Sequence, residues 1–365
     1  MTKKNRIFIC PLGWGLGHAG RIIPLAIKLH ELGNQIVIGA DKELLQFLKS
    51  ELPFAEFISF KGFRPRYSGI LPQYIALMLQ APILIYHIIK EHYSLSKIVN
   101  NISIDIVISD NRFGLWNRKI RSAYITHQPH IPFPEPFHFL EFAGEFLHKA
   151  IIKRYNLCFI PDLPGKDNFS GRLSHGHKLP DNIRYIGILS RFSTFKNSNT
   201  ENKESGNCAT VILSGPEPQR RILREKLIKI LKTLKIKSVI LEGRPGEVRK
   251  ALEHEGITSI SHLPSQQMCE LIKTSNPIIS RSGYTTIMEL ASLGKSALLV
   301  PTPGQPEQEY LAEYLSEKGW FATVCQENLD KIQEIPEIIP GWQEDITEQS
   351  DKLLQQALIE LLSIE

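Results

Sequence analysis

The chain has 365 residues, of which 42% are hydrophobic and 22% are charged, and this composition is typical of a soluble protein long enough for two domains. Its five cysteines are scattered, odd in number and free of C-x-x-C spacing, which argues against a disulfide framework or a cysteine zinc site and fits a reducing compartment. The net charge of +5 is uneven, because residues 1–191 carry +10 and residues 192–365 carry −5.

The first half of the chain alternates short apolar runs with segments of helical spacing. Helices are expected at Arg21–Leu32, where Gly33 ends the pattern, and from Asp41 to about Ser50. Buried strands alternating with helices predict a parallel, doubly wound sheet. The expected strands are Arg6–Cys10, Gln35–Ile38, Ala55–Ile58, Ile104–Ser109 and Tyr124–Thr126.

The pattern stops at residues 191–207, which are polar and lack periodicity, and then starts again. We therefore predict an α/β fold of two Rossmann-like, doubly wound domains that face a central cleft. Residues 1–190 would form the first domain, 191–207 a linker or long loop, and 208–342 the second domain. A last helix in residues 343–365 is expected to pack back towards the first domain. The second half should begin with a strand at Ala209–Leu213, a turn at Ser214–Pro216, a helix at Gln219–Leu234 and a strand at Ser238–Leu241.

A glycine-rich turn, Gly13–Gly20, follows the first expected strand. Its glycines allow close backbone approach, and the helix beyond it offers an anion-binding N-terminus. Counted from Gly13, the spacing departs from G-x-G-x-x-G because position 18 is histidine, and no acidic residue suited to a ribose ends the second expected strand, so dinucleotide binding is weakly supported. His18 stands at the carboxyl end of a strand, where it would either remove a proton from a hydroxyl or water, or simply cap the turn.

A second strand, turn and helix pattern spans Pro277–Leu290. Ser282 and Gly283 stand where the amides of a helix N-terminus can bind a diphosphate. Glu289 falls about two turns into that helix, where a carboxylate can accept hydrogen bonds from both ribose hydroxyls, unless it lies on a solvated face. The polar loop after the next strand holds Gln305, Glu307 and Gln308, which suit sugar hydroxyls or form an ordinary rigid loop.

These features resemble the GT-B glycosyltransferases of family 28, which include the bacterial lipid-II N-acetylglucosaminyltransferase. The resemblance rests on Ser280–Gly283 with Glu289, on Leu299–Pro301 with Gln305–Gln308, and on the His-containing turn Gly13–His18. It implies an inverting, metal-independent transfer of a sugar, such as an N-acetylhexosamine, from a UDP-sugar to a hydroxyl acceptor. The UDP-sugar would be a co-substrate, and no cofactor is expected.

The resemblance also implies residue roles. Glu289 would hold the ribose, and Arg281, Ser282 and Gly283 would border the diphosphate. Gln305 and Gln308 would face the donor sugar, and His18 would face the reacting centre. Prolines replace the family's glycines in the turn Ser214–Arg220, so Arg220 or Arg221 would supply positive charge there. The other expected donor contacts are Gly17, Ser214, Gly215, Arg220, His262, Leu263 and Glu307.

In this interpretation the catalytic residues are His18 and Asp110. Asp110 ends an expected strand and would orient His18, act as the base itself, or merely cap a turn. We expect no metal, because neither D-x-D nor H-x-x-x-H occurs. His127, His130 and His138 lie in a segment expected to form a loop over the acceptor cleft; a metal site formed by them is the alternative, which the intervening prolines disfavour.

The sequence features expected to bind the acceptor are less specific for one kind of ligand. Residues Leu71–Ile89 are largely apolar, which predicts either a buried helical hairpin or a surface for lipid-linked acceptors, helped by Arg64, Arg66, Lys90 and Lys97. The basic first half predicts an anionic partner, either a phosphorylated acceptor or a membrane surface, whereas nucleic acid is not expected. The apolar run Ile7–Cys10 is too short for a signal peptide, so we expect a cytoplasmic protein, with peripheral contact at the inner face of the membrane as the alternative.

Three rival functions share the same motifs. A UDP-sugar hydrolase would use water as the acceptor and release free sugar. A 2-epimerase would return an epimerised sugar nucleotide. A non-catalytic sugar-nucleotide-binding subunit would need Glu289 but not His18.

Overall fold

A computed structural model describes residues 4–65, 78–132, 139–195, 208–245, 252–336, 338–342 and 345–364 of the chain. These residues divide into two compact units. Within the described ranges, unit 1 comprises residues 4–65, 78–189 and 345–364, and unit 2 comprises the residues between 190 and 342. Each unit has a seven-stranded, largely parallel sheet, which confirms the prediction of two doubly wound α/β domains.

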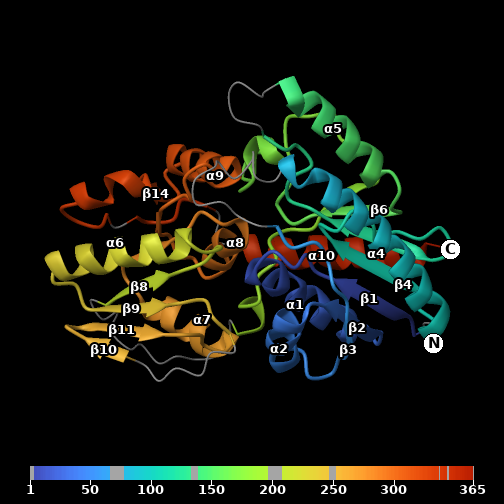
Figure 1. Cartoon of the computed structure of the whole chain (residues 1–365), viewed down its shortest axis with the longest axis horizontal. Coiled ribbons are helices and arrows are strands. Elements are labelled where there is room, and N and C mark those ends of the chain that lie inside the picture. The colour runs from blue at the N-terminus through green and yellow to red at the C-terminus, as the bar shows by residue number, and fades with distance from the viewer. Residues whose placement is uncertain are drawn as a thin grey trace. The chain divides into compact units, whose positions relative to one another are not determined.

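The sheet of unit 1 is parallel throughout, in the order β3-β2-β1-β4-β5-β6-β7 (Figure 1). The strand order reverses direction between β1 and β4, which are neighbours although far apart in sequence. The elements of this unit are β1 (Arg6–Cys10), α1 (Leu16–Glu31), β2 (Gln35–Ala40), α2 (Lys42–Glu51), β3 (Glu56–Ser59), α4 (Ala81–Ile102), β4 (Ile106–Asp110), β5 (Arg121–Ile125), α5 (Phe139–Ile152), β6 (Leu157–Ile160), the 3-10 helix η1 (Gly171–Leu173), β7 (Ile183–Tyr185) and α10 (Ile346–Ser363).

Strand β1 shows how the sheet is covered on both faces. Successive side chains of a strand point to opposite faces. Accordingly, Ile7 and Ile9 join the core formed with α1, α2 and α10, whereas Phe8 and Cys10 join a second core that contains Leu95 of α4. Because both faces are buried, the strand is apolar at every position from Ile7 to Cys10, and this continuous run is the signal by which the sequence predicts it.

The C-terminal helix α10 is part of unit 1 (Figure 1). Its buried side chains Leu354, Leu358 and Leu361 lie in the same core as β1. The backbone of Gly187 lies against the backbone of α10, since a Cβ at Gly187 would lie 2.2 Å from Cα of Ser350. The long-range contact is therefore made by backbone as well as by apolar side chains.

Two expected boundaries are wrong. Helix α1 begins at Leu16 rather than Arg21, so the second half of the glycine-rich turn is helical, with Gly15 as its N-cap. Glycine is a weak helix former, but packing on the sheet overrides that preference. Residues 191–195 are not a linker either, because Arg191 and Phe192 are buried in unit 2. Residues 196–207 lie outside the described residues.

The sheet of unit 2 has the order β10-β11-β9-β8-β12-β13-β14, and only the pair β10–β11 is antiparallel. Its order reverses between β8 and β12. The elements are the 3-10 helix η2 (Ser193–Phe195), β8 (Ala209–Ile212), α6 (Gln219–Thr233), β9 (Ser238–Leu241), β10 (Leu252–His254), β11 (Ile257–Ile260), α7 (Ser265–Thr274), β12 (Ile278–Ser280), α8 (Tyr284–Ser292), β13 (Leu298–Leu299), α9 (Pro306–Glu317), β14 (Ala322–Thr323) and the 3-10 helix η3 (Gln326–Lys331).

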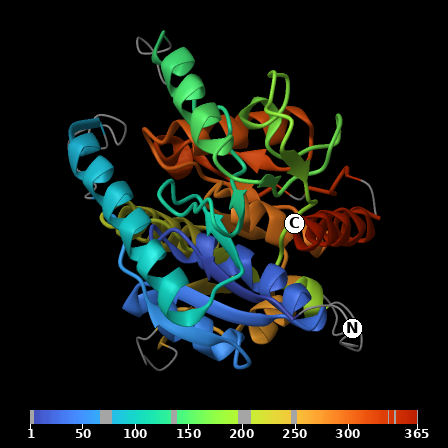
Figure 2. The same ribbon diagram turned by 90° about the vertical axis from the view of Figure 1, so that its right-hand side faces the viewer.

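Helices α4 and α5 lie at the periphery of unit 1 (Figure 2). Both helices expose apolar side chains. Residues 78–89 of the apolar stretch are not a buried hairpin, since most of their large apolar side chains are exposed, and residues 71–77 lie outside the described residues. None of the helices in the described ranges is both long and apolar enough to cross a bilayer. The exposed side chains are Leu79, Ile83, Ile85, Tyr86, Ile89 and Tyr93 on or before α4, and Phe139, Phe142, Phe146 and Leu147 on α5.

Candidate active site

The first cluster of functional side chains lies where the strand order of unit 1 reverses. Open α/β sheets bind ligands at the carboxyl ends of the strands at such a point. β1 leads into the turn before α1, whose first turn carries His18, and β4 ends at Asp110. The Nδ1 atom of His18 lies 2.8 Å from Oδ2 of Asp110. The fold thus brings together two residues that the sequence places 92 positions apart.

A buried arginine completes this cluster. Arg21 follows His18 by one helical turn, and its guanidinium forms an ion pair with Asp110. It also contacts Nδ1 of His18 at 2.7 Å and Nδ1 of His127 at 3.0 Å. Arg21 is not among the site residues expected from the sequence, although an arginine at i+3 from His18 within an apolar helix is a visible signal.

The electrostatics assign different roles to the acid and the imidazole. Burial, together with the positive charge of Arg21, lowers the pKa of His18 below 6.5 and outweighs the opposing effect of Asp110. Burial by itself would raise the pKa of Asp110, but Arg21 and His18 outweigh it and hold that pKa below its usual value. At neutral pH the cluster therefore contains a carboxylate beside a neutral imidazole.

The tautomer of His18 follows from its neighbours. Nδ1 of His18 lies 2.8 Å from Oδ2 of Asp110, which can only accept, and 2.7 Å from Nη2 of Arg21, which can only donate. Because the ionised carboxylate is the stronger partner and Arg21 also pairs with it, we assign the Nδ1 proton of His18 to a hydrogen bond donated to Asp110. This leaves the Nε2 lone pair available as a base. The Asp110 side chain is fully buried whereas 19% of the His18 side chain is exposed, so Asp110 can orient the ring but cannot itself reach a substrate.

Unit 1 also has a cavity of about 660 Å³, which is lined by other residues than His18, Arg21 and Asp110. Its wall contains three cationic side chains, Lys42, Lys61 and Arg64, together with apolar Phe63 and Ile83. The glycine-rich turn contacts the same wall, because Trp14 Nε1 donates a hydrogen bond to the Phe63 carbonyl at 3.0 Å. A Cβ at Gly13 would lie 2.7 Å from Oδ2 of Asp41, another lining residue. Such a wall suits an anionic group joined to an apolar one.

The second cluster lies where the strand order of unit 2 reverses. Ser214 and Gly215 follow β8, and Arg281–Gly283 follow the neighbouring β12. Gly283 is the N-cap of α8, so the positive end of this helix dipole points at the same edge of the sheet. The backbone at residues 282–284 therefore provides a site suited to an anion.

Arg281 does not serve this site through its side chain. The guanidinium is fully buried and donates hydrogen bonds to the carbonyls of Val300, Pro301 and Gln219 and to Oε1 of Gln326. Burial lowers its pKa to about 10. In this structure the Arg281 side chain therefore holds neighbouring backbone segments together, and its expected place beside a diphosphate stays a prediction.

Glu289 is buried and paired with Arg191. Nε of Arg191 donates to Oε1 of Glu289 at 2.7 Å, and Nη2 lies 3.5 Å from Oε2. The same guanidinium contacts Ser265 and Met268 at the start of α7, directly after His262 and Leu263. Arg191 thus ties the carboxylate expected to hold a ribose to the loop expected to hold a base. The sequence gives no sign of it, because Arg191 stands at the edge of a polar segment.

The turn after β8 is flanked by charged residues. Glu217 Oε1 accepts hydrogen bonds from Arg220 at 2.9 Å and from Arg244 at 3.1 Å. Both arginines line a cavity of about 260 Å³ at this end of the sheet. Gly243 holds the loop of Arg244 against β8, since a Cβ there would lie 2.5 Å from the Leu213 carbonyl oxygen. Arg244 thus adds a second cation, beside the predicted Arg220, near the turn Ser214–Arg220 that is expected to meet a diphosphate.

The loop before α9 is held by its own side chains. Gln308 is buried, its Oε1 accepts from the amide of Thr302 at 2.9 Å, and its carbonyl accepts from Ser282 Oγ at 2.7 Å. The side-chain oxygen of Gln308 thus shapes the loop, and its expected contact with a donor sugar stays a prediction. Gln305 is the half-exposed N-cap of α9, and Glu307 is half-exposed beside it.

Comparison with known proteins identifies the fold and the enzyme class. Residues 223–356 match the glycosyltransferase family 28 C-terminal domain. An uncharacterized glycosyltransferase of Methanosarcina acetivorans is 24% identical over 360 residues, 92% of this chain and 90% of that protein. The UDP-N-acetylglucosamine--N-acetylmuramyl-(pentapeptide) pyrophosphoryl-undecaprenol N-acetylglucosamine transferase of Haemophilus influenzae is 30% identical over 157 residues, 40% of this chain and 42% of that enzyme.

A solved structure titled as the glycotransferase of kitacinnamycin superposes on the whole chain. Its TM-score is 0.62 at 14% identity, and the match covers 99% of this chain and 95% of that one. This likeness shows the GT-B fold. Together with the family match it confirms the resemblance stated from the sequence.

Replacing Arg281 with methionine tests its structural role. We expect Arg281→Met to lower the free energy of unfolding by about 2–4 kcal/mol, because buried acceptors lose their donor. Urea unfolding followed by fluorescence measures this change. Arg221→Met, whose wild-type side chain is 63% exposed on α6, is the matched control and should change stability by less than about 0.5 kcal/mol. If Arg281→Met had normal stability but lost nucleotide binding, Arg281 would instead be assigned to the diphosphate site.

Proposed function

We propose that this GT-B glycosyltransferase, which resembles family 28 in its C-terminal half, transfers a sugar from a UDP-sugar to a hydroxyl acceptor. The main support is the Arg191–Glu289 pair, which holds a buried carboxylate next to the loop at His262 and Leu263. This arrangement suits a nucleoside, whose ribose would meet the carboxylate of Glu289 and whose base would meet the loop. The Haemophilus influenzae relative is named for UDP-N-acetylglucosamine, which favours an N-acetylhexosamine as the donor sugar.

Donor binding would use backbone and charge in unit 2. Glu289 would accept hydrogen bonds from the ribose hydroxyls, since a carboxylate has lone pairs beyond those used by Arg191. The N-terminus of α8 would bind the diphosphate, and Arg220 and Arg244 would add positive charge. These groups would stabilise the leaving nucleoside diphosphate, so we assign that role to the chain itself rather than to a metal ion.

Catalysis would use His18 as the general base. Its Nε2 would take the proton from the acceptor hydroxyl as that oxygen forms a bond to the anomeric carbon. The bond from this carbon to the diphosphate oxygen breaks in the same step, which inverts the configuration. Asp110 would hold the ring and stabilise the imidazolium that forms. Arg21 would keep Asp110 ionised.

The acceptor would be anionic and lipid-linked. The cavity of unit 1 combines Lys42, Lys61 and Arg64 with apolar side chains, which suits a phosphorylated head joined to a hydrocarbon chain. The exposed apolar faces of α4 and α5 offer a surface for peripheral contact with a membrane. The name of the Haemophilus influenzae relative includes a pyrophosphoryl-undecaprenol acceptor, which supports the same class here.

Donor recognition is tested by Glu289→Gln. Losing the charge of the carboxylate should weaken UDP-sugar binding by about 10- to 100-fold, because hydrogen bonds to charged groups contribute about 1.5–3 kcal/mol. Calorimetric titration with a panel of nucleotide sugars gives the dissociation constants. The exposed Glu313→Gln on α9 is the control and should bind normally. Unchanged affinity in Glu289→Gln would refute the ribose assignment.

The base assignment predicts a pH profile. Since the pKa of His18 lies below 6.5, transfer should be constant near neutral pH and fall as the ring is protonated at lower pH. His18→Ala should lower kcat by about 10²–10⁴-fold at nearly unchanged donor affinity. Asp110→Asn should lower kcat and move the acid limb to still lower pH, because it removes the charge that favours the imidazolium.

These rates are measured with a lipid-linked acceptor, alongside an assay of free sugar. His254→Ala, at a 75% exposed side chain of unit 2, is the control and should retain full activity. Normal turnover of a folded His18→Ala protein would exclude the base role. Stoichiometric release of free sugar without acceptor would identify a hydrolase instead.

The membrane proposal is tested by flotation with vesicles containing phosphatidylglycerol. The double variant Phe142→Ser, Phe146→Ser should lower the bound fraction by about tenfold or more, because each exposed phenylalanine that enters a bilayer contributes about 1.5–3 kcal/mol. Ile359→Ser removes an exposed apolar side chain of α10 and should bind like the wild type. Equal binding by the double variant would contradict the proposal.

A further inference from the structure

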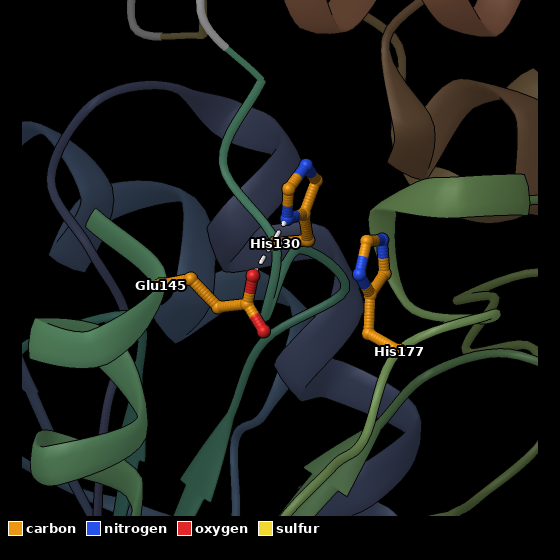
Figure 3. A group of neighbouring side chains, drawn as sticks. All are labelled: His130, Glu145 and His177. Carbon is orange, nitrogen blue, oxygen red and sulfur yellow. Dashed lines mark ion pairs between the residues drawn. The ribbon is translucent and has the colours of Figure 1, made fainter. Parts of the chain in front are cut away.

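Three side chains that the proposed reaction does not use come together in unit 1. Figure 3 shows His130, Glu145 and His177 pointing towards one another. His130 follows β5, Glu145 lies on α5, and His177 follows η1. One ligand atom of each lies within 4.8 Å of the others. This set differs from His127, His130 and His138, because His127 contacts Arg21 and His138 lies outside the described residues.

The spacing fits a small divalent cation. Nδ1 of His130 lies 3.5 Å from Oε2 of Glu145. In a tetrahedral zinc site with bonds of about 2.0–2.2 Å, neighbouring ligand atoms lie about 3.3–3.6 Å apart. The rings of His130 and His177 are stacked, with centroids 4.1 Å apart and planes 13° from parallel. Because a metal lies near the plane of each imidazole that binds it, the half-exposed His177 ring would have to turn out of this stack to bind the same ion.

His130 carries an independent sign of a missing ligand. Its side chain is 8% exposed, and its buried Nδ1 has no hydrogen-bond partner among the described residues. Buried polar atoms normally have a partner, and a cation beside Nδ1 would provide one. On the other side of the ring, Nε2 lies 3.4 Å from Oε2 of Glu141. A carboxylate on the second nitrogen fixes the tautomer of a metal-binding histidine.

The chemistry of the donors selects the metal. Two imidazole nitrogens and one carboxylate oxygen suit zinc and other divalent first-row transition metals, whereas magnesium and calcium prefer oxygen ligands alone. Lys149 forms an ion pair with Oε1 of Glu145, which leaves Oε2 as the single ligand atom of that carboxylate. Its positive charge opposes a cation nearby, so it weakens the site without blocking it.

We propose that His130, Glu145 and His177 bind one Zn²⁺ ion, with water in the fourth position. The ion fastens α5 and the segment after η1 to the loop that follows β5. The ion takes no part in the proposed sugar transfer. The site therefore goes beyond the proposed function and is tested independently of it.

Calorimetric titration of the EDTA-treated full-length protein with ZnCl₂ tests the site. We expect one equivalent to bind, and MgCl₂ to leave the heat signal unchanged. His177→Ala and Glu145→Gln should each weaken binding by about tenfold or more, since each removes one of three ligands. His254→Ala, an exposed histidine of unit 2, is the matched control and should bind as the wild type does.

Two further measurements keep the test independent of damaged folding. The melting temperature of the wild-type protein should rise with ZnCl₂ concentration, as it does for any ligand bound only by the native state. Lys149→Met keeps every ligand and should bind Zn²⁺ more tightly than the wild type. The proposal is overturned if folded wild-type protein binds no stoichiometric Zn²⁺, or if the ligand variants and the control bind equally.

Discussion

The reversal of strand order in each sheet is the constraint on which the sites depend. At β1 and β4 in unit 1, and at β8 and β12 in unit 2, the connections from neighbouring strands leave in opposite directions. The carboxyl edge between them stays uncovered by a crossover. Side chains and helix N-termini at these two points face a ligand instead of a core. His18 with Asp110, and Gly283 with Ser214, occupy these positions because no other edge of the sheet offers them.

Four arginines are buried near these edges among the described residues; Arg112 pairs with Glu91 beside the end of β1, and the other three bear on the two clusters. A charge taken out of water is tolerated only when it is paired or fully hydrogen-bonded. Arg21 meets this condition through Asp110, Arg191 through Glu289, and Arg281 through three carbonyls and Gln326. The first two fix carboxylates that we place in the reaction, and the third fixes loops. Buried arginines therefore orient carboxylates in two places and hold loops together in a third.

Particular residues show how far sequence reasoning reaches. The continuous apolar runs and the residues that directly follow them place His18, Asp110, Ser282 and Glu289 at strand ends or on the adjoining helices, and the structure has them there. Arg281 lies at the predicted point of the chain, but its side chain turns inward, because the direction of a side chain depends on neighbours distant in sequence. Arg191 is missed, since its partner stands 98 positions away.

The sequence by itself determined the alternation of strands and helices, the restart of that pattern in the second half and the glycosyltransferase resemblance, because periodicity and turn residues are local properties. Tertiary structure alone decided which charged groups meet. The Arg21–Asp110 and Arg191–Glu289 pairs, the packing of α10 in unit 1 and the convergence of His130, Glu145 and His177 all join distant segments. Such contacts form only when the sheets have ordered their strands, and no local pattern encodes them.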